Sequence, residues 1–370
     1  MTISGSERVT VRHYVAGGHE HGGGIGRLVG NILGARGLTL RHSMVDTRGP
    51  RWNPLYSPLY LLGAMAVMGF DRVTAPHSLH QLHIAGRGST TRKLILGTWA
   101  RWLGCRYILH LHDYDYSADF WRRSNRQRRA IRRLFRAAAR VIVLGQRDLD
   151  LVQNELGVPP RRSTVLRNCV ADPGQRNTRQ GDEVRILFLG QLGPRKGVPE
   201  LLDALADPEM SRQGWSATLA GDGPVEAYRN RVAELGLQDR VHLPGWLGAA
   251  ETAALRDASD ILVLPSHAEG FAMAVLEGLA QGMAVVTTRV GAHDEVLEDG
   301  RNCLFVPVGD AHALARALSR LVGDAALRAR LGEEGRRLYL SGFDIDGYVH
   351  RLEDLHDRVD RGSFAVRSSA

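Results

Sequence analysis

The sequence alternates, over most of its length, between short apolar segments and longer helical segments that start in glycine-rich or polar turns. Short apolar runs bounded by turns are typical of buried strands, and the segments between them have the length of helices. Repeated strand–helix units imply right-handed crossovers and parallel sheets with helices on both faces. A chain of 370 residues is too long for one ordinary core. We therefore predict an α/β protein with two Rossmann-like domains in tandem and a cleft between them.

A polar, turn-rich segment at residues 171–182 interrupts this alternation, and we interpret it as an interdomain linker. The predicted domains span residues 1–172 and 183–342. The first domain has expected strands at residues 9–15, 38–45, 79–84, 106–111, 141–144 and 165–170. The second has expected strands at residues 184–189, 215–220, 240–243, 261–264, 284–287 and 303–306. A last helix, at 348–359, follows the second pattern.

Composition limits the kinds of partner and the compartment. The net charge is +8 and arginine supplies nearly all the positive charge, which suits a phosphate, a nucleic acid or an acidic lipid surface. The three cysteines have no metal-ligand or redox spacing, so we expect a reducing compartment. The N-terminus lacks a basic start and a long apolar core, so no signal peptide is expected. The longest apolar run, at 59–70, is shorter than the roughly 20 residues that span a bilayer.

Residues 120–140 form the most basic stretch of the chain, in which Trp121, Ile131, Leu134 and Phe135 interleave with arginines. We predict one helix with a partly apolar face. It is either a solvated surface helix or an interfacial helix that contacts anionic lipid. Nucleic acid is a weaker third option, because the chain has no recognition motif and a basic patch alone is not enough.

Two features of the first domain lie where parallel strands end, and ligands bind at such ends in open sheets. The first is the glycine-rich segment 16–26, which follows the first strand and leads into a helix. It lets backbone N–H groups approach a phosphate or sugar, although a purely structural turn explains the spacing equally well. The second is His112, at the end of the fourth strand.

Three loops at strand ends of the second domain suit a nucleoside diphosphate. The first, residues 190–197, carries adjacent cations, Arg195 and Lys196, in a turn rich in glycine and proline. The second, residues 220–224, is a tight turn. The third, residues 267–282, leads into a helix whose first N–H groups, at residues 270–272, point at an anion.

Two carboxylates in this third loop and its helix, Glu269 and Glu277, are eight residues apart. The helix rises about 9 Å between Phe271 and Glu277, so the two side chains are not expected to share a proton. The spacing suits an elongated ligand with hydroxyl groups on both sides of a diphosphate, as in a nucleotide sugar. The rival interpretation is a glycosidase acid and nucleophile pair, which tandem parallel sheets with a cationic phosphate site disfavour.

The chain resembles a retaining glycosyltransferase of family 4 with the GT-B fold, and the resemblance covers nearly the whole chain. It rests on Glu-x7-Glu at Glu269 and Glu277, on Gly-x4-Arg-Lys-Gly at residues 190–197, on the turn at 220–224, and on residues 22–26, 287–300 and 306–310. One residue departs from the family pattern, because Ala272 replaces the glycine or proline that often follows the phenylalanine.

The resemblance implies a role for each matching residue. Catalytic residues would be His112, Glu269, Arg195 and Lys196. Donor-binding residues would be Gly23, Gly24, Gly190, Arg195, Lys196, Gly221, Gly270, Phe271, Ala272 and Glu277. Glu269 and His112 would face the donor sugar, Glu277 the ribose, and the cation pair the diphosphate. The last helix, with its flanks at 343–362, would cross back onto the first, acceptor-binding domain.

These implications make the expected donor a nucleoside-diphosphate sugar, with no cofactor and no metal ion. Three Asp-x-Asp segments, at 113–115, 148–150 and 344–346, resemble the metal motif of another transferase fold, but the cation pair and the helix already cover the diphosphate. The expected acceptor is a hydroxyl of a lipid-linked saccharide at the cytoplasmic membrane face, in cell-surface polysaccharide synthesis. A soluble natural product is the alternative acceptor. A basic nucleic-acid-binding protein and an inactive transferase are remoter alternatives, and nucleic acid is not expected as a partner.

Overall fold

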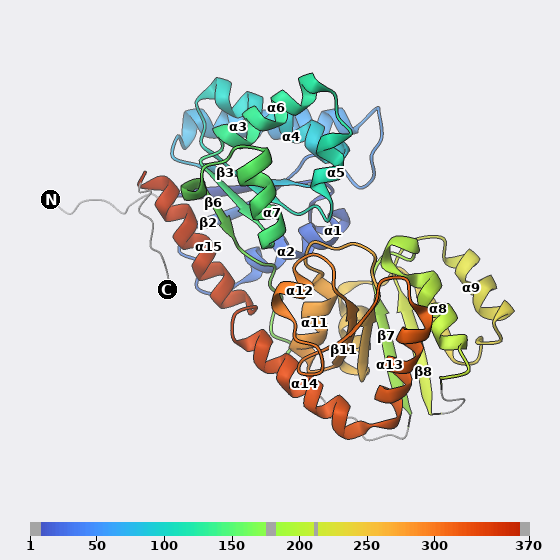
Figure 1. Ribbon diagram of the computed structural model, residues 1–370. Helices are drawn as coiled ribbons and strands as arrows, with labels where there is room; N and C mark the ends of the chain where they lie inside the picture. The colour runs from blue at the N-terminus through green and yellow to red at the C-terminus, as the bar shows by residue number, and fades with distance from the viewer. Residues whose placement is uncertain (1–8, 175–182, 211–213, 363–370) are drawn as a thin grey trace. The chain divides into compact units, whose positions relative to one another are not determined.

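The computed structural model describes residues 9–174, 183–210 and 214–362. It divides into two units, each built on one parallel sheet with helices on both faces (Figure 1). Unit 1 runs to Cys169 and takes up the chain again from Ile345, and unit 2 holds Val170–Asp344. The prediction of two Rossmann-like parallel-sheet domains is confirmed. Of the predicted linker at 171–182, residues 175–182 lie outside the described residues.

Unit 1 contains a six-stranded sheet in the order β2-β1-β3-β4-β5-β6, in which every pair is parallel. Its strands are β1 Thr10–Val15, β2 Arg41–Asp46, β3 Leu79–Ile84, β4 Tyr107–Leu111, β5 Arg140–Val143 and β6 Ser163–Val165. The strand order reverses direction between β1 and β3, so the carboxyl ends of these two strands border the crevice where such sheets bind ligands.

The helices of unit 1 cover both faces of this sheet. They are α1 Gly18–His21, α2 Gly23–Gly34, α3 Ser57–Thr74, α4 Gly88–Leu103, α5 Tyr116–Trp121, α6 Asn125–Ala137, α7 Gln146–Asp150 and α15 Ile345–Asp360, with a π-helical turn at Leu151–Glu155 and a 3-10 turn at Pro160–Arg162. Helices α3, α4 and α6 pack side by side on one face, and α15 packs against α2 (Figure 1). The core between β3, β4 and the first group is fully buried and includes Leu82, Leu109, Leu134 and Phe135.

Unit 2 contains a second six-stranded parallel sheet, in the order β12-β11-β10-β7-β8-β9. Its strands are β7 Val184–Leu189, β8 Trp215–Ala220, β9 Val241–Gly245, β10 Ile261–Leu264, β11 Ala284–Thr288 and β12 Leu304–Val306. Its helices are α8 Val198–Ala206, α9 Val225–Glu234, α10 Ala249–Asp257, α11 Met273–Gln281, α12 His293–Val296, α13 Ala311–Gly323 and α14 Ala325–Leu340, with a 3-10 turn, η3, at Pro194–Lys196. Helix α13 packs on α8, and α14 packs on α11.

The Arg-rich stretch is two helices rather than the single predicted one. Helix α5 ends at Trp121, and Ser124 caps α6, because its hydroxyl accepts from the N–H of Gln127 and the Gln127 side chain accepts from the N–H of Ser124. The apolar face of α6 is buried against unit 1 itself, and Phe135 has no exposed surface. Phe135 is therefore a core residue and cannot contact lipid.

One further sequence prediction is wrong in detail. The sixth strand of unit 1 spans Ser163–Val165 instead of residues 165–170, and Leu166 and Cys169 are buried in irregular backbone. The apolar run there indicated burial and not a strand. The glycine-rich segment 16–26 leads into a helix as predicted, and it contains the short helix α1 and the first turn of α2.

Candidate functional site

The candidate donor site of unit 2 lies where its strand order reverses. Strands β7 and β10 are neighbours in the sheet, although three helices and two strands separate them in the chain. The loops that follow these two strands, residues 190–197 and 265–272, therefore meet at the carboxyl edge of the sheet. This edge is where open parallel sheets bind their ligands.

An ion pair joins the two loops. Nζ of Lys196, in the turn η3, lies 2.5 Å from Oε1 of Glu269. Nη1 of Arg195 donates to the carbonyl oxygen of Ala268 at 2.9 Å and lies 3.5 Å from the same Glu269 oxygen. The backbone N–H of His267 also donates to the carbonyl oxygen of Arg195. The predicted cation pair and Glu269 thus form one cluster.

Burial and charge act in opposite directions on Glu269. Burial alone would raise the pKa of its carboxyl group, but the charge and hydrogen bond of Lys196, with a smaller contribution from Arg195, lower it below its ordinary value. Glu269 is therefore an ionised carboxylate at neutral pH. It can accept hydrogen bonds from sugar hydroxyls, and it holds the Lys196 ammonium group at the carboxyl edge of β7.

Helix α11 begins beside this cluster, with Ala272 as its N-cap residue. The backbone N–H of Ala272 donates to Nε2 of His293, 3.3 Å away. Of the three N–H groups predicted to face an anion, the one at Ala272 therefore already has a protein acceptor. Phe271 is buried and packs on the rings of His293 and Phe343.

His293 is a positioning residue that the sequence analysis missed. Burial lowers its pKa to about 4, so the ring is neutral and Nε2 can accept from Ala272. Nδ1 then carries the proton and faces the hydroxyl of Thr287 at 3.3 Å and the carbonyl oxygen of Thr288 at 3.4 Å. The residue lies in the family-like segment 287–300, but its spacing from Glu269 forms no recognisable pattern.

Two glycines let backbone segments approach closely at this site. A Cβ at Gly291 would lie 2.1 Å from the carbonyl oxygen of Glu269 and 2.3 Å from that of Gly270. A Cβ at Gly221 would lie 1.7 Å from the carbonyl oxygen of Gly190, which joins the loops after β7 and β8. Any side chain at these positions would push apart the segments that carry the site.

Glu277 lies on α11, and the structure places it against a different cation. Its Oε2 lies 3.4 Å from Nη1 of Arg256, on α10, and both side chains are largely buried. Glu269 pairs instead with Lys196. The two carboxylates thus belong to separate charge pairs.

The other predicted site residues belong to unit 1. His112 directly follows β4 and is half-buried, and its Nε2 lies 2.9 Å from Nδ1 of His83. Gly23 and Gly24 are exposed in the first turn of α2. The roles predicted for His112, Gly23 and Gly24 toward a donor stay predictions.

A cavity of about 500 Å³ lies at the strand-order reversal of unit 1. Its lining includes His83, Ser89, Trp52 and two cationic side chains, Arg48 and Arg92. Nε of Arg92 is a buried atom that has no hydrogen-bond partner among the described residues. The cavity therefore has two positively charged side chains in its wall next to the end of β3, and the Arg48 guanidinium is held in place by the carbonyl oxygens of His21, Gly49 and Pro50.

Lys93 is fully buried on α4, the helix that carries Arg92, and its Nζ donates to the hydroxyl of Thr47 at 3.1 Å. Burial, with the neighbouring charge of Arg92, lowers its pKa to about 7. The chain has only two lysines, Lys93 and Lys196. One of them lies in the candidate donor site, and the other is buried on a helix that lines the unit 1 cavity.

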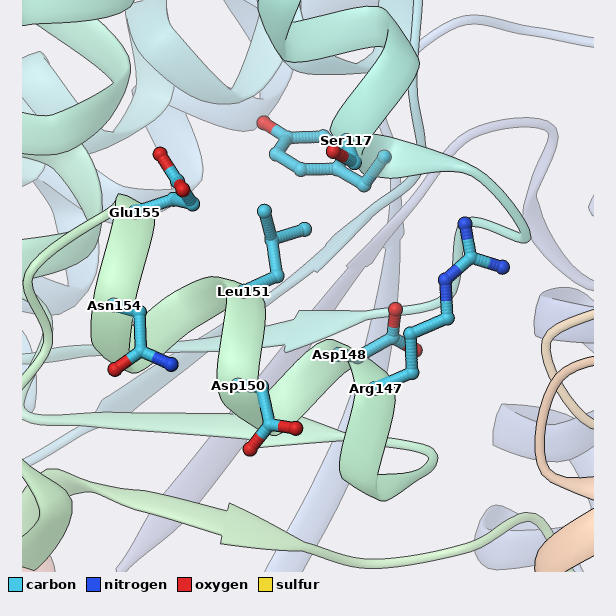
Figure 2. A pocket seen from close by; sticks show the side chains of 8 residues that line it. Ser117, Arg147, Asp148, Asp150, Leu151, Asn154 and Glu155 are labelled. Atoms are coloured by element: carbon cyan, nitrogen blue, oxygen red, sulfur yellow. The ribbon is translucent and has the colours of Figure 1, made fainter.

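A second cavity of unit 1, of about 280 Å³, lies between α5 and the α7 segment. Figure 2 shows Asp148, Asp150 and Arg147 on the α7 side of this cavity, Glu155 farther along the same segment, and Ser117 on the α5 side. Three carboxylates line it, so it is less suited to an anion than the cavity with Arg48 and Arg92.

One group among the described residues has the composition of a metal site. The side chains of His83, His110 and His112 bring their ligand atoms within 4.8 Å of one another. Each ring uses at least one nitrogen in a hydrogen bond, because His83 Nδ1 meets His112 Nε2 at 2.9 Å and His110 Nδ1 meets Nε2 of Gln81 at 3.2 Å. The prediction that the donor diphosphate is bound without a metal ion stays a prediction.

Comparison with known proteins gives two family matches and several relatives. Residues 174–338 match the family of glycosyl transferases group 1, and residues 9–169 match the glycosyl transferase 4-like domain. The chain is 29% identical, over 77% of its length and 82% of the relative, to a lipopolysaccharide core biosynthesis glycosyltransferase, LpsE, of Rhizobium meliloti. It is 25% identical, over 62% of its length and 63% of the relative, to an alpha-D-kanosaminyltransferase of Streptomyces kanamyceticus.

Solved structures show the same fold. The crystal structure of Anabaena HepE in complex with UDP and glucose superposes with a TM-score of 0.74 at 18% identity, over 95% of this chain and all of that one. The two family matches together cover both units, and the fold is that of GT-B glycosyltransferases. The chain belongs to the group 1 glycosyltransferases, with an N-terminal glycosyl transferase 4-like domain.

Proposed function

We propose that this glycosyltransferase moves a hexose-type sugar from a nucleoside diphosphate to a hydroxyl group of a lipid-linked saccharide, with retention of the anomeric configuration. The proposal that the donor is a nucleoside-diphosphate sugar rests on the cluster of Arg195, Lys196 and Glu269 at the strand-order reversal of unit 2. It places two cations and one ionised carboxylate within a few ångströms of each other. The two cations can pair with the negative charges of a diphosphate, and the carboxylate can accept a hydrogen bond from a sugar hydroxyl.

Each residue of the donor site then has a defined task. Arg195 and Lys196 stabilise the negative charge that develops on the departing diphosphate. Glu269 and His112 orient the sugar, and Glu277 binds the ribose. The leaving phosphate takes the proton of the acceptor hydroxyl as the new glycosidic bond forms. Retention and these roles are inferred from the resemblance to family 4.

The unit 1 cavity supports an acceptor with an anionic group. Arg48 and Arg92 face one space of about 500 Å³ at the ends of β1 and β3, and Trp52 at its rim offers an apolar surface. Phosphate and carboxylate groups bind to such arginine pairs. A saccharide carried on a lipid phosphate has both an anionic group and hydroxyl groups. The sequence relative LpsE, a lipopolysaccharide core glycosyltransferase, supports the same class of acceptor.

Helix α3 supports contact with a membrane surface. Leu55, just before the helix, and Leu59, Leu62, Phe70 and Val73 on it are each more than half exposed, at spacings that place them along one stripe. Trp102 of α4 is also exposed, and its neighbour Trp99 donates to the carbonyl oxygen of Met65 on α3. A face this apolar marks an interaction site.

We therefore place the membrane contact on α3 and not on the buried apolar face of α6. The exposed arginines of α6, among them Arg126 and Arg129, supply charge for anionic lipid from the same side of the sheet. Among the described residues, no helix combines the length and apolar character needed to cross a bilayer. Cys105, Cys169 and Cys303 form no disulfide bond, which fits the reducing cytoplasmic side.

The donor proposal is tested by binding and turnover together. A thermal-shift screen with UDP, GDP and ADP sugars identifies the base and sugar, since a ligand at 100 times its Kd stabilises the fold by about 2.7 kcal/mol. Lys196→Ala and Glu277→Ala are then compared with wild type in donor hydrolysis and transfer. We expect each to lose about a hundredfold or more in activity. Wild-type rates in both variants would contradict the donor site.

The acceptor proposal is tested with Arg48→Ala and Arg92→Ala against the exposed control Arg320→Ala, on α13 of unit 2. We expect the two cavity variants to raise the KM for a lipid-linked acceptor while donor hydrolysis stays at the wild-type rate. Transfer to soluble natural-product acceptors that exceeds transfer to lipid-linked ones would support the alternative acceptor class instead.

The membrane proposal is tested by co-sedimentation with vesicles of phosphatidylglycerol at low salt. We expect the double variant Leu59→Gln, Leu62→Gln to weaken binding at least about tenfold, because each exposed leucine loses its apolar burial in the interface. The double variant Arg126→Gln, Arg129→Gln should weaken vesicle binding at low salt and make that binding less dependent on the salt concentration. Equal binding of the α3 variant and wild type would exclude α3 as the contact.

A further inference from the structure

Four histidines form a continuous hydrogen-bonded chain across the sheet of unit 1. His42 on β2, His13 on β1, His83 on β3 and His112 after β4 come from four neighbouring strands. The chain begins at His42 Nδ1, which lies 2.9 Å from His13 Nε2. His13 Nδ1 lies 3.0 Å from His83 Nε2, and His83 Nδ1 lies 2.9 Å from His112 Nε2. Every link joins an Nδ1 of one ring to an Nε2 of the next.

These rings are neutral, so each must donate through one nitrogen and accept through the other. Burial lowers the pKa of His13 and His83 well below the ordinary value, that of His42 less far, and that of His112 to about 3. Because the links all run in the same sense, the chain has two ordered states. Either every ring carries its proton on Nε2, or every ring carries it on Nδ1.

Glu353 of α15 stands at the end of the chain opposite to His112. Its Oε1 lies 3.3 Å from Nε2 of His42, and its two oxygens also accept from the N–H groups of Thr39 and Leu40 and from the Thr39 hydroxyl. Burial would raise the pKa of this carboxyl group, but these hydrogen bonds lower it. An ionised carboxylate only accepts, so His42 must carry its proton on Nε2.

That constraint passes along the chain from ring to ring. With Nε2 of His42 protonated, its Nδ1 accepts from His13, the Nδ1 of His13 accepts from His83, and the Nδ1 of His83 accepts from His112. His112 therefore holds its proton on Nε2 and turns an unprotonated Nδ1 away from the chain. Nδ1 of His112 has no hydrogen-bond partner among the described residues.

We propose that Glu353 is a positioning residue that, through His42, His13 and His83, fixes the Nε2–H tautomer of His112. The Nδ1 of the half-buried His112 is thereby held as a hydrogen-bond acceptor for a hydroxyl group at the carboxyl end of β4. The tautomer assignment stands on unit 1 alone. Its effect on transfer rests on the proposed function, in which His112 orients the donor sugar.

A second network keeps the neighbouring histidines out of the chain. The side chain of Gln81, on β3, accepts through Oε1 from Nε2 of His356 at 2.7 Å and donates through Nε2 to Nδ1 of His110 at 3.2 Å. Both rings are thereby held as neutral Nε2–H tautomers beside His42 and His112. The charged or titratable groups that face His112 are His83 from β3, His110 from β4 and Lys93 from α4.

Nitrogen-15 NMR of histidine-labelled protein at pH 7 tests the assignment directly. The expected spectrum of wild type shows His112, assigned by comparison with His112→Asn, as the neutral Nε2–H tautomer. A neutral Nδ1–H form or a charged ring at His112 in wild type would overturn the proposal without any further variant. One bound zinc ion per purified chain, measured by atomic emission and lost in His83→Asn, would also overturn it.

Glu353→Gln tests the control by Glu353, because its amide can donate to Nε2 of His42 and so permits the opposite state. We expect the Nδ1–H form of His112 to appear in this variant, and the transfer kcat to fall about tenfold with donor affinity unchanged. The matched control is Asp354→Asn, the next residue on α15, which is exposed and lies outside the chain. It should leave both the tautomer and the kcat at wild-type values.

The variants separate the two proposals. If Glu353→Gln leaves His112 in the wild-type tautomer, Glu353 does not set it. If Glu353→Gln does not fold, His42→Asn takes its place, because it breaks the same chain between Glu353 and His13. The Nδ1–H form of His112 should then appear in the NMR spectrum of His42→Asn. If wild type turns over no nucleotide sugar, the proposed function fails, while the NMR result still decides the role of Glu353.

Discussion

The ammonium group of Lys196 lies 2.5 Å from Oε1 of Glu269, and this pair joins the loops that follow β7 and β10. Both side chains are largely buried, with 14% and 9% of their surface exposed. Removing one partner of a buried ion pair is strongly destabilising, because the other charge is left unpaired. The pair therefore ties together the two loops of the candidate donor site.

Lys196→Met is expected to destabilise the protein by about 3 kcal/mol, because it removes the nearer cation from the buried Glu269 and leaves Arg195, 3.5 Å away, to balance its charge. The double variant Lys196→Met, Glu269→Gln should recover most of this loss, because it removes the unpaired charge. Neither variant should transfer sugar. Chemical denaturation and a transfer assay measure the two effects. Equal stability of the single and double variants would show that the buried charge is not the cause.

His293→Phe is expected to cost about 1–3 kcal/mol, because the buried N–H of Ala272 loses its acceptor while the ring volume is kept. Donor affinity should also fall, since Ala272 caps the helix beside the Glu269 cluster. The control His312→Ala removes an exposed pair with Asp207 and should cost less than about 1 kcal/mol. Urea unfolding measures the stability of His293→Phe and His312→Ala, and donor titration measures their affinity for the donor. A His293→Phe variant that binds donor as wild type does would exclude the positioning role.

Gly291→Ala is expected to abolish transfer or folding, because its Cβ would collide with the carbonyl oxygens of Glu269 and Gly270. Gly300→Ala is the matched control. Gly300 has a similar positive φ, +69° against +55°, but a Cβ at this position would have no atom within 4 Å. It should therefore lose only about 1 kcal/mol from backbone strain. Melting temperature and activity of the two variants separate collision from strain, and equal effects would rule out collision.

Acid is expected to destabilise this protein through its buried histidines. Burial lowers the pKa of His80 and His293 to about 4, and that of His112 and His356 to about 3, against 6.5 when unfolded. Between these values the unfolded state binds more protons than the folded state. The free energy of unfolding therefore falls as the pH drops below 6.5, by up to about 1.4 kcal/mol per pH unit for each such histidine.

Urea unfolding at pH 5 and pH 7 measures this slope. His80→Gln should make the slope shallower by removing one buried histidine, whatever it does to stability at pH 7. The exposed His77→Gln should leave the slope as it is in wild type. A slope unchanged by His80→Gln would mean that His80 does not contribute to acid sensitivity.

Local sequence patterns predicted the regular elements well where one pattern dominated. The strands at Leu79–Ile84, Val184–Leu189 and Ile261–Leu264 have the predicted bounds, because each is a short apolar run closed by a turn. The pattern failed at residues 120–140, where a capping box at Ser124 ends one helix and begins the next inside a uniformly basic stretch. It also did not reveal which face of α3 is exposed, because that depends on what packs against the helix.

The sequence by itself determined the α/β class, the parallel sheets and the position of Arg195, Lys196 and Glu269 at strand ends. These follow from short-range periodicity and turn chemistry, which each segment carries alone. Only the tertiary structure decided that Lys196 pairs with Glu269, that His293 accepts from Ala272, and that four strands align their histidines from Glu353 to His112. Such contacts join residues far apart in the chain, so they exist only once strand order and register bring those residues together.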